Sequence, residues 1–394
     1  IDTETDSLKA NEAKLVGVSL SIADGDACYI PLGHVTDDNK LDKNQLSKDI
    51  VLPILKIILE DESILKVGHN IKFDSLILRQ KLNGEIKVFP LEDTLCLSYV
   101  IDGGRKSHKL DNLALDYLNY NTIKFEDVCG RGTKKITFDK VNVKDALNYA
   151  AEDADITLRL YQVLKSKILK DKLVNVYETL ERPLIKVLEE MESSGIKVDK
   201  RLLQNLSYEF QEKLIYFEEQ IYKICGIKFN IASPKQLGEI IYNELKIAVL
   251  KKTKKGSFAT SASVLEDLSF RGHKFPQLIL DWRQVSKLKN TYSDSLREHI
   301  NPHTKRVHTS FLLAATSTGR LASSDPNLQN IPIKSEDGKE IRKAFIAEKG
   351  FTLISADYNQ IEMRILADLA DVKELKKAFK NLVIKTFRRR SSEP

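Results

Sequence analysis

The sequence predicts an α/β domain, then a mainly helical region, and finally a region of mixed α and β structure. Three patterns lead to this prediction. Strand-like and helix-like runs alternate up to about residue 168, which is typical of helices packed on a central sheet. Residues 171–300 instead repeat apolar side chains every three or four positions, the spacing of amphipathic helices. Short strand-like runs return from residue 308 onward.

The first domain is expected to begin with strands. Residues 1–34 show the two-residue period of a half-buried strand, carried by Val16, Val18, Leu20 and Ile22. A turn is predicted at Asp24-Gly25, after which residues 27–30 resume the sheet. Residues 44–82 are expected to be helical, apart from a short strand at residues 65–68. These elements together predict helices packed against a sheet.

Long helices are expected in the middle region. One of them should bury a face made of Leu203, Leu206, Phe210, Leu214, Phe217, Ile221 and Ile224. The lysine-rich run at residues 251–256 fits a solvated loop and a phosphate-contacting tip equally well. Farther on, residues 351–357 are predicted to form a strand that ends in an acidic residue, and residues 361–370 a helix.

The composition is that of a globular protein, because 42% of the 394 residues are hydrophobic and 30% are charged. A net charge of +6 is compatible with a phosphate-backbone partner but does not argue strongly for one. No apolar run is long enough to span a bilayer. The acidic first residues lack the basic region of a signal peptide, and we expect residues upstream of them. The four cysteines are widely spaced, which favours reduced thiols in a cytoplasmic protein over zinc or disulfides.

Two carboxylates lie close together at the start of the chain. On a strand, Asp2 and Glu4 point to the same face and Thr3 points away. Neighbouring carboxylates repel each other unless a cation lies between them, and their hard oxygens suit Mg²⁺ or Mn²⁺. An isolated pair of this kind is, however, usually an ordinary acidic strand end.

Two further pairs have helical spacing. Asn70 and Asp74 are four residues apart, so on a helix they share a face, and the same holds for Tyr149 and Asp153. Each pair alone is weak evidence, because an Asp on a helix is usually a solvated surface charge. Their order and spacing, combined with the acidic pair at the start, are much more specific.

These three stretches resemble the exonuclease motifs of the DEDD nuclease superfamily, in its tyrosine subclass. The similarity is greatest to the proofreading domain of bacterial family A DNA polymerases of the polymerase I type. Residues 2–8 and 149–155 match that domain almost letter for letter, and the resemblance extends through residues 91–94 and 125–127. It implies a ribonuclease H-like α/β fold, with helices on a mixed sheet, over residues 1–168.

The resemblance also implies a metal centre with two Mg²⁺ or Mn²⁺ ions. Asp2, Glu4 and Asp153 would hold the first ion, and Asp2 and Asp74 would place the second. Two such ions can activate the attacking water and stabilise the leaving 3′ oxygen.

Other residues of the same motifs would act on water and DNA. Tyr149 would orient the water, because an unperturbed pKa near 10 favours a hydrogen-bonding role over that of a general base. Leu8 and Phe125 match apolar residues that pack against the terminal bases. Asn70 would help to hold the strand.

A second resemblance covers the later part of the chain. Residues 318–332 are a long match to the palm of family A DNA polymerases, and residues 229–237 and 252–256 resemble the thumb. The resemblance implies a mainly helical thumb at residues 169–300 and a truncated α+β palm at residues 301–380. DNA contacts are expected from Lys252, Lys254, Lys255, Arg283, Lys287, Lys289, Arg320, Asn327, Gln329 and Asn330.

Residues 357–364 resemble the first catalytic motif of the palm. Asp357 would be a metal ligand, Glu362 would exclude a ribose 2′-OH, and Gln360 would belong to the same incomplete nucleotide site. The resemblance ends after residue 381, before a fingers helix or a second palm carboxylate. We therefore expect no primer extension from this chain and a disordered basic tail at residues 381–394.

Three functions remain open at this level. The leading one is a monomeric 3′-5′ exonuclease that removes nucleotides from single-stranded 3′ ends and primer–template DNA during replication and repair. A catalytically silent fragment that binds primer–template is the first alternative. The second is a ribonuclease D-like enzyme that trims RNA, against which residues 318–332 and the thumb-like region count.

Overall fold

The computed structural model describes residues 1–247, 258–333 and 335–380. It contains two compact units, Ile1–Ile346 and Ala347–Pro394. Within the described ranges, no helix is both long and apolar enough to cross a membrane. The lysine-rich run at residues 251–256 and the expected tail lie outside these ranges, and with them Lys252, Lys254 and Lys255.

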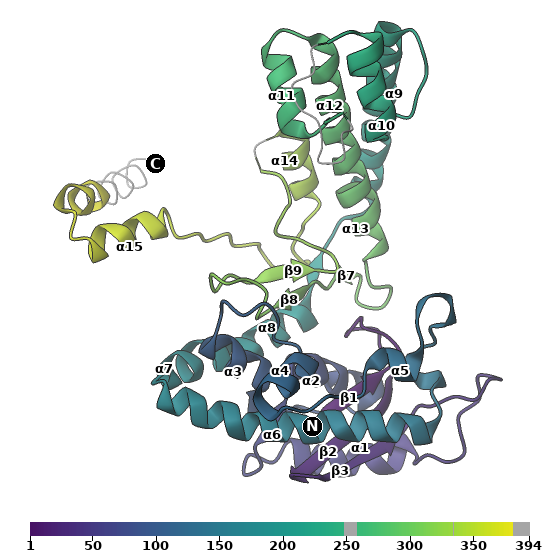
Figure 1. Cartoon of the computed structure of the whole chain (residues 1–394), viewed down its shortest axis with the longest axis vertical. Helices are drawn as coiled ribbons and strands as arrows, with labels where there is room; N and C mark the ends of the chain where they lie inside the picture. Colours follow the sequence, from purple (N-terminus) through teal and green to yellow (C-terminus); the bar gives the residue numbers. More distant parts are fainter. Residues whose placement is uncertain (248–257, 334, 381–394) are drawn as a thin grey trace. The chain divides into compact units, whose positions relative to one another are not determined.

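Strands with both antiparallel and parallel pairing begin the first unit (Figure 1). β1 (Asp2–Thr5) pairs antiparallel with β2 (Leu15–Ala23), which pairs antiparallel with β3 (Asp26–Pro31). β4 (Lys66–Gly68) and β5 (Leu91–Asp93) form a parallel pair. The Ile1 amino group donates a 2.8 Å hydrogen bond to the Val67 carbonyl oxygen and so joins β1 to β4. The predicted strands and the turn at Asp24-Gly25 are confirmed.

Helices pack on these strands. They are α1 (Lys48–Leu59), α2 (Ile71–Arg79), α3 (Thr94–Ile101), α4 (Leu110–Leu118), α5 (Phe125–Cys129) and α6 (Val143–Lys170). The long α6 lies against β2 and β3. It buries Ala146, Ala150 and Ala154, whose four-residue spacing places small side chains on one face and allows close contact with the sheet.

The next part of the unit is mainly helical, as predicted. It contains α8 (Arg182–Ser194), α9 (Lys200–Cys225), α10 (Pro234–Glu239), α11 (Ala262–Phe270), α12 (Lys274–Leu288), α13 (Ser295–Glu298) and α14 (Glu336–Lys343), besides shorter turns. α9 buries most of its predicted apolar face against α12 and α14. Ile224 is the exception, since it is 43% exposed in the last turn before the capping Gly226.

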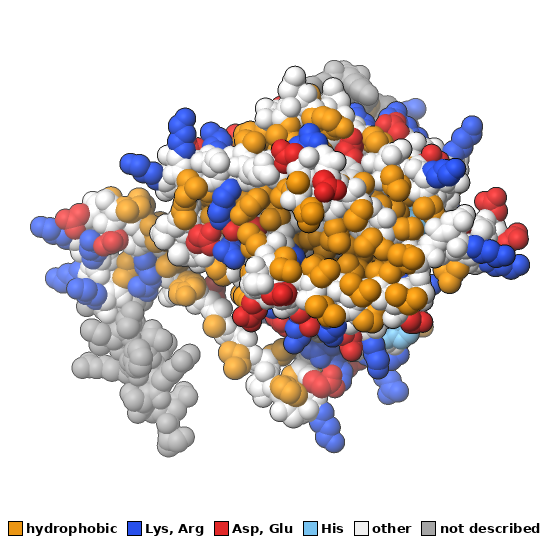
Figure 2. All heavy atoms as spheres, turned by 90° about the horizontal axis from the view of Figure 1, so that it is seen from below, with side chains coloured by type: hydrophobic (Ala, Val, Ile, Leu, Met, Phe, Trp, Pro, Cys, Tyr) orange, Lys and Arg blue, Asp and Glu red, His pale blue; other side chains and the backbone are white. Residues whose placement is uncertain are grey.

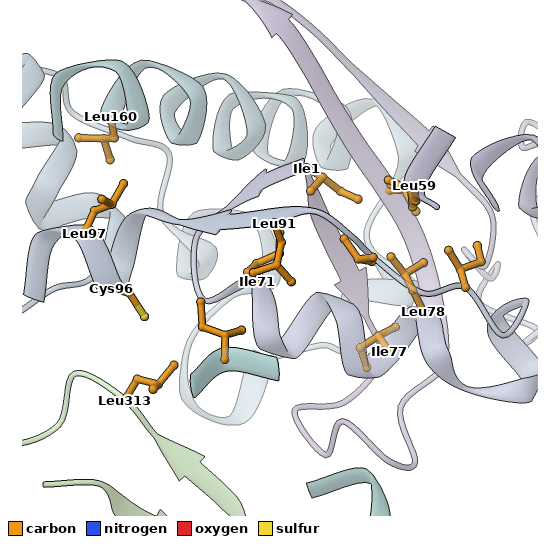
Figure 3. Packing of buried hydrophobic residues seen from close by; sticks show 14 of the residues in the cluster. Ile1, Leu59, Ile71, Ile77, Leu78, Leu91, Cys96, Leu97, Leu160 and Leu313 are labelled. Atoms are coloured by element: carbon orange, nitrogen blue, oxygen red, sulfur yellow. The ribbon is translucent and has the colours of Figure 1, made fainter. Parts of the chain in front are cut away.

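Two short strand pairs connect the helical part to the rest of the unit. β6 (Ile196–Lys197) pairs with β7 (Arg306–Val307), and β8 (Ser310–Leu312) pairs with β9 (Ala322–Ser324). The β8–β9 hairpin reaches back to the first domain. Leu313, which follows β8, belongs to the same core as Ile77, Leu97 and Leu160, and Figure 3 shows it beside Cys96.

The second unit agrees with the sequence only in part. α15 (Ile361–Leu369) confirms the predicted helix. The predicted strand at residues 351–357 is wrong, because these residues are exposed and form no regular structure. A strand is stable only when neighbouring backbone groups pair with its own, and no described strand pairs with residues 351–357.

A broad group of apolar side chains covers the face seen in Figure 2. α1 contributes an exposed stripe, since Ile50, Ile54 and Ile57 are 65%, 55% and 73% exposed. The opposite side of α1 buries Val51, Leu55 and Leu59 in the core. α1 is therefore apolar on two faces, of which one is packed.

Replacing a buried isoleucine and replacing an exposed one should have very different effects on the free energy of unfolding. Ile77→Ala removes a fully buried side chain and should lower the free energy of unfolding by about 2–5 kcal/mol, because it leaves a cavity in the core. Ile57→Ala, on the exposed stripe of α1, serves as the matched control and should change it by less than about 0.5 kcal/mol. Urea titration followed by circular dichroism measures both, and equal effects would contradict the packing described here.

Candidate active site

β1 and α6 bring three carboxylates together. Asp2 and Glu4 come from β1 and Asp153 comes from α6, and one ligand oxygen of each lies within 4.8 Å of the others. Glu4 and Asp153 are each only 8% exposed. Among the described residues, this is the one group of three or more such side chains with metal-binding geometry. The structure thus brings together the three acids that the resemblance assigns to the first metal ion, and their role as ligands stays a prediction.

Asp74 approaches the same strand from α2. Its Oδ1 accepts a 2.9 Å hydrogen bond from the Thr3 N–H and a 2.5 Å hydrogen bond from the Thr3 hydroxyl. Thr3 lies between Asp2 and Glu4 in β1, and its two hydrogen bonds fix the fourth carboxylate at the pocket that Asp2 and Glu4 also line. Asp74 is 3% exposed.

Asn70 is placed at the start of α2 rather than within it. It precedes the first helical residue and has a left-handed backbone with φ 61° and ψ 42°. Asp93 holds this corner, because its carboxylate accepts hydrogen bonds from the N–H groups of Asn70 and Ile71 at 3.0 and 3.1 Å. Asn70 and Asp74 line one pocket, although they do not share a helical face in the way the spacing predicted.

Burial of these acids raises their pKa values. Desolvation raises the pKa of Asp2 to about 6. The pKa values of Glu4, Asp74 and Asp153 lie well above their usual range, chiefly because of burial and also because the neighbouring carboxylates repel one another. A divalent cation would offset both effects, since hard carboxylate oxygens are its preferred ligands. The residues present therefore fit a divalent metal ion.

Tyr149 lies one helical turn before Asp153 on α6. Its hydroxyl donates a hydrogen bond to the Asp153 carboxylate, and burial together with the nearby carboxylates raises its pKa far above the usual value. The ring contacts Phe125 edge-on at 6.3 Å and Phe138 at 5.8 Å between centroids. Tyr149 is therefore a protonated, oriented hydroxyl at the edge of the acidic cluster.

The acids and Tyr149 line a pocket of 530 Å³. Leu8 and Phe125, which the resemblance assigns to the terminal bases, also line this pocket, with exposed fractions of 89% and 38%. His69, Phe73, Phe138 and Lys135 also line it and were not predicted. Phe73 directly precedes Asp74, so its place beside a candidate site residue could have indicated that it lines the pocket. Lys135 lies 5.3 Å above the Phe125 ring, and nothing in the sequence indicated this contact.

The predicted DNA-contacting residues of the helical part fall into two groups: some line a groove, and one is paired with an acid of the protein. Arg283 and Lys287 line a groove of 710 Å³ together with Ser261 and Asn290. Lys289 instead lies 2.6 Å from Asp294 and is 17% exposed, so its charge is compensated within the protein. The sequence did not indicate this pairing, because Asp294 is five residues after Lys289, and an α-helix places residues three or four apart on one face.

The residues around β9 serve mostly to shape the chain. Gln329 accepts a hydrogen bond from the Ser323 N–H and donates one to the Leu321 carbonyl oxygen. Asn327 accepts one from the Gln329 N–H. Arg320 is exposed and lies just before β9. The Asn330 carbonyl oxygen accepts a hydrogen bond from the Tyr292 hydroxyl.

The predicted nucleotide site lies in the second unit. Asp357, Gln360 and Glu362 are all exposed, and Gln360 caps α15 with a left-handed backbone of φ 52°. Asp357 belongs to no group of three metal-binding side chains among the described residues. Its role as a metal ligand stays a prediction.

Comparison with known families divides the chain in two. Residues 1–169 match the family model described as 3'-5' exonuclease, and residues 200–385 match the model described as DNA polymerase family A. The second match runs past residue 381, where the sequence resemblance was expected to end.

Curated proteins named DNA polymerase I match over nearly the whole chain. The protein from Rhizobium leguminosarum is 48% identical over 96% of this chain and 38% of its own length. The one from Pseudomonas aeruginosa is 45% identical over 96% of this chain and 41% of its own length. The chain thus spans about two fifths of the length of these relatives.

A solved structure shares the fold. It is the POL domain of Pol1 from M. smegmatis, in complex with DNA primer-template and dNTP. The TM-score is 0.76 at 29% identity, over 96% of this chain and 60% of the other.

The raised pKa values predict an unusual pH dependence of stability without metal. A carboxyl whose folded pKa is raised stabilises the fold below its unfolded value of about 4 and loses that contribution as the pH rises through its folded value. In chelator, the first domain should therefore lose this stabilisation as the pH rises through about 6, the value for Asp2, and beyond. Glu4→Gln removes one buried charge and should stabilise the domain at pH ~8 by about 1 kcal/mol or more, the equivalent of one pKa unit.

Thermal unfolding in chelator at pH ~5 and ~8 measures this effect. Glu12→Gln is the matched control, since Glu12 pairs with Lys9 at the exposed surface and should change little. Added Mg²⁺ should raise the melting temperature of the unsubstituted chain more than that of Glu4→Gln. A Glu4→Gln chain that melts lower than its parent in chelator at the higher pH would contradict the electrostatic description.

Proposed function

The chain belongs to DNA polymerase family A and carries the 3′-5′ exonuclease domain found in that family, and on this basis we propose that it removes nucleotides from DNA 3′ ends by metal-dependent hydrolysis. The observation that carries the proposal is the convergence of Asp2, Glu4 and Asp153 within 4.8 Å in a pocket that also contains Asp74 and Tyr149. In this role the activity would serve proofreading.

The proposed metal ligands are the buried acids. Asp2, Glu4 and Asp153 would hold one Mg²⁺ or Mn²⁺ ion, and Asp2 with Asp74 a second. The ions, when bound, would activate the attacking water and stabilise the leaving 3′ oxygen. Thr3 keeps Asp74 in place through two hydrogen bonds to the same oxygen.

Tyr149 is proposed to orient the attacking water. Its raised pKa keeps the hydroxyl protonated at neutral pH, which argues against a general base and for a hydrogen-bonding group. Leu8 and Phe125 offer exposed apolar surfaces at the pocket, on which an unstacked terminal base can pack regardless of its identity. A sequence-independent exonuclease needs contacts of this kind.

We also propose that the later part of the chain binds duplex DNA as a polymerase thumb and partial palm. Arg283 and Lys287 line the groove with hydroxyl and amide side chains, a combination suited to a phosphate backbone. The similar POL domain is titled as a complex with DNA primer-template. The family A match over residues 200–385 favours DNA over the RNA substrates of a ribonuclease D-like enzyme.

Digestion of 5′-labelled DNA in Mg²⁺ tests the proposed exonuclease. The chain should shorten single strands and mismatched ends from the 3′ side, faster than paired ends, because the site must admit an unstacked terminus. Asp2→Ala or Asp153→Ala should retain less than a tenth of the rate, since each supplies a metal ligand. Glu12→Gln, outside the pocket, is the control.

Full rates for Asp2→Ala and Asp153→Ala would overturn the assignment of the site. Equal rates on paired and mismatched ends would leave an exonuclease but remove the proofreading role. Faster digestion of RNA than of DNA would favour the ribonuclease reading.

Tyr149→Phe tests whether the Tyr149 hydroxyl orients the attacking water without contributing to metal binding. The substitution removes the hydroxyl and keeps the ring packed against Phe125 and Phe138, so cleavage should slow by about 10–10⁴-fold while the Mg²⁺-induced rise in melting temperature persists. Phe138→Leu, which changes the packing but no hydroxyl, is the comparison. An unchanged rate for Tyr149→Phe would mean that Tyr149 only packs.

A further inference from the structure

We propose that Lys135 binds a backbone phosphate of the DNA strand whose 3′ end enters the acidic pocket, the 530 Å³ pocket that the acids and Tyr149 line. The inference rests on the proposed exonuclease function and deepens it, because it names a side chain that holds the sugar–phosphate backbone. Leu8 and Phe125, by contrast, were proposed to contact the bases.

The acidic pocket is lined by carboxylates with a single cationic side chain among them. The five acids are Asp2, Glu4, Asp6, Asp74 and Asp153. Among the described residues that line the pocket, Lys135 is the only lysine or arginine. His69 adds no positive charge at neutral pH, because burial lowers its pKa to about 4. A DNA strand carries one negative charge on each phosphate, so a strand lying in this pocket needs cations along its backbone.

The charge of Lys135 is not compensated within the described part of the chain. Arg131, on the same loop, forms an ion pair with Glu126. No described carboxylate forms an ion pair with Lys135, whose Nζ instead lies 5.3 Å from the centre of the Phe125 ring. Such a cation–π contact is weak at an exposed site, and the ring covers only one side of an ammonium group that has three N–H donors. Donors therefore remain for a phosphate oxygen. Since the proposed divalent ions would contact the phosphate that is cleaved, Lys135 serves a neighbouring phosphate of the strand.

The backbone fixes where Lys135 leaves the chain. Lys135 ends a short loop after α5, and the Ile136 N–H closes this loop with a 2.8 Å hydrogen bond to the Cys129 carbonyl oxygen. Gly130 turns the chain with φ +77°, and a Cβ there would lie 2.9 Å from the Lys134 carbonyl oxygen. Only glycine combines this left-handed backbone with so close an approach. The closed loop therefore holds Lys135 at the pocket, where its side chain is exposed and accessible to a strand.

The Phe125 ring links Lys135 to the Tyr149 hydroxyl, which is proposed to orient the attacking water. Phe125 packs nearly parallel to Phe138, with an angle of 22° and 6.4 Å between centroids, and edge-on against Tyr149 at 6.3 Å. Lys135 and Tyr149 thus contact the same ring. The phosphate held by Lys135 is not the one that reacts, so this contact is the same in the bound strand and in the transition state. Losing it should weaken binding and leave the cleavage rate of the bound strand nearly unchanged.

Single-turnover digestion of a short 5′-labelled oligothymidylate in Mg²⁺ tests the proposal, because it gives the apparent Kd and the limiting rate separately. Lys135→Gln should raise Kd about 5–30-fold, as expected for loss of a charged hydrogen bond at an exposed site, and change the limiting rate by less than about threefold. The dependence of log Kd on log salt should become shallower by about 0.7, the share of one phosphate on a single strand.

Two further variants separate the contact from general charge and from packing. Lys134→Gln is the matched control, since it removes the same charge from the same loop at a side chain that does not line the pocket, and it should behave like the parent. Lys135→Arg keeps the charge and the donors and should restore Kd to within about threefold of the parent. Fluorescence anisotropy of the same oligonucleotide in chelator measures binding without catalysis, and Lys135→Gln should bind more weakly there too.

A parent-like Kd and salt dependence for Lys135→Gln would overturn the inference. An equal loss in Lys134→Gln would also overturn it, because the loop would then attract DNA only through its general charge. Failure of Lys135→Arg to restore binding would mean that Lys135 only packs on Phe125. If the parent does not digest the strand, the proposed exonuclease function fails, and the anisotropy comparison then decides the role of Lys135 by itself.

Discussion

The structure of the first domain depends on one electrostatic constraint: four carboxylates, three of them buried and Asp2 half-buried, lie on and beside a single short strand. β1 supplies Asp2 and Glu4, α6 supplies Asp153, and α2 brings Asp74 to the same pocket, where Thr3 holds it. Burial and mutual repulsion disfavour the charged forms of all four acids. Such a cluster is costly for folding alone and becomes favourable once a divalent cation is bound.

The surrounding fold keeps this arrangement rigid. Lys72, two residues before Asp74, directs its charge away from the acids and into a buried pair with Glu192. Asp93 fixes the left-handed corner at Asn70, which sets where α2 begins. The same Glu192 also holds the β8–β9 hairpin, so the exonuclease domain and the following region share anchoring residues. Because the two regions share this residue, the two family matches describe structurally connected parts of one chain.

Elements with a regular spacing of apolar residues could be predicted from the sequence. Features that depend on contact with another part of the chain could not. The apolar spacing of α9 reports its own environment, and both β2 and α9 form where expected. The alternation in β2 does not hold in detail, because Ser19 is buried and Ile22 is exposed near the end of the strand. The strand predicted at residues 351–357 failed because a strand needs neighbours that the period does not reveal. The acids of the site followed from motif spacing, but the restraint of Asp74 by Thr3 and the pairing of Lys289 with Asp294 are three-dimensional facts. The hydrogen bonds of the Tyr99 hydroxyl with the Thr316 carbonyl oxygen and the Gly319 N–H carried no sequence signal either, since these residues lie over two hundred positions away in the chain.

Direct counting of bound Mn²⁺ by electron paramagnetic resonance tests most sharply whether the buried acids are a metal centre. The complete chain should bind Mn²⁺ saturably near neutral pH, and Asp2→Ala should lose that binding. Asp357→Ala, which removes an exposed carboxylate of the second unit, should retain it. Undiminished binding by Asp2→Ala, or loss of binding in Asp357→Ala instead, would contradict the assignment of the metal to β1 and α6.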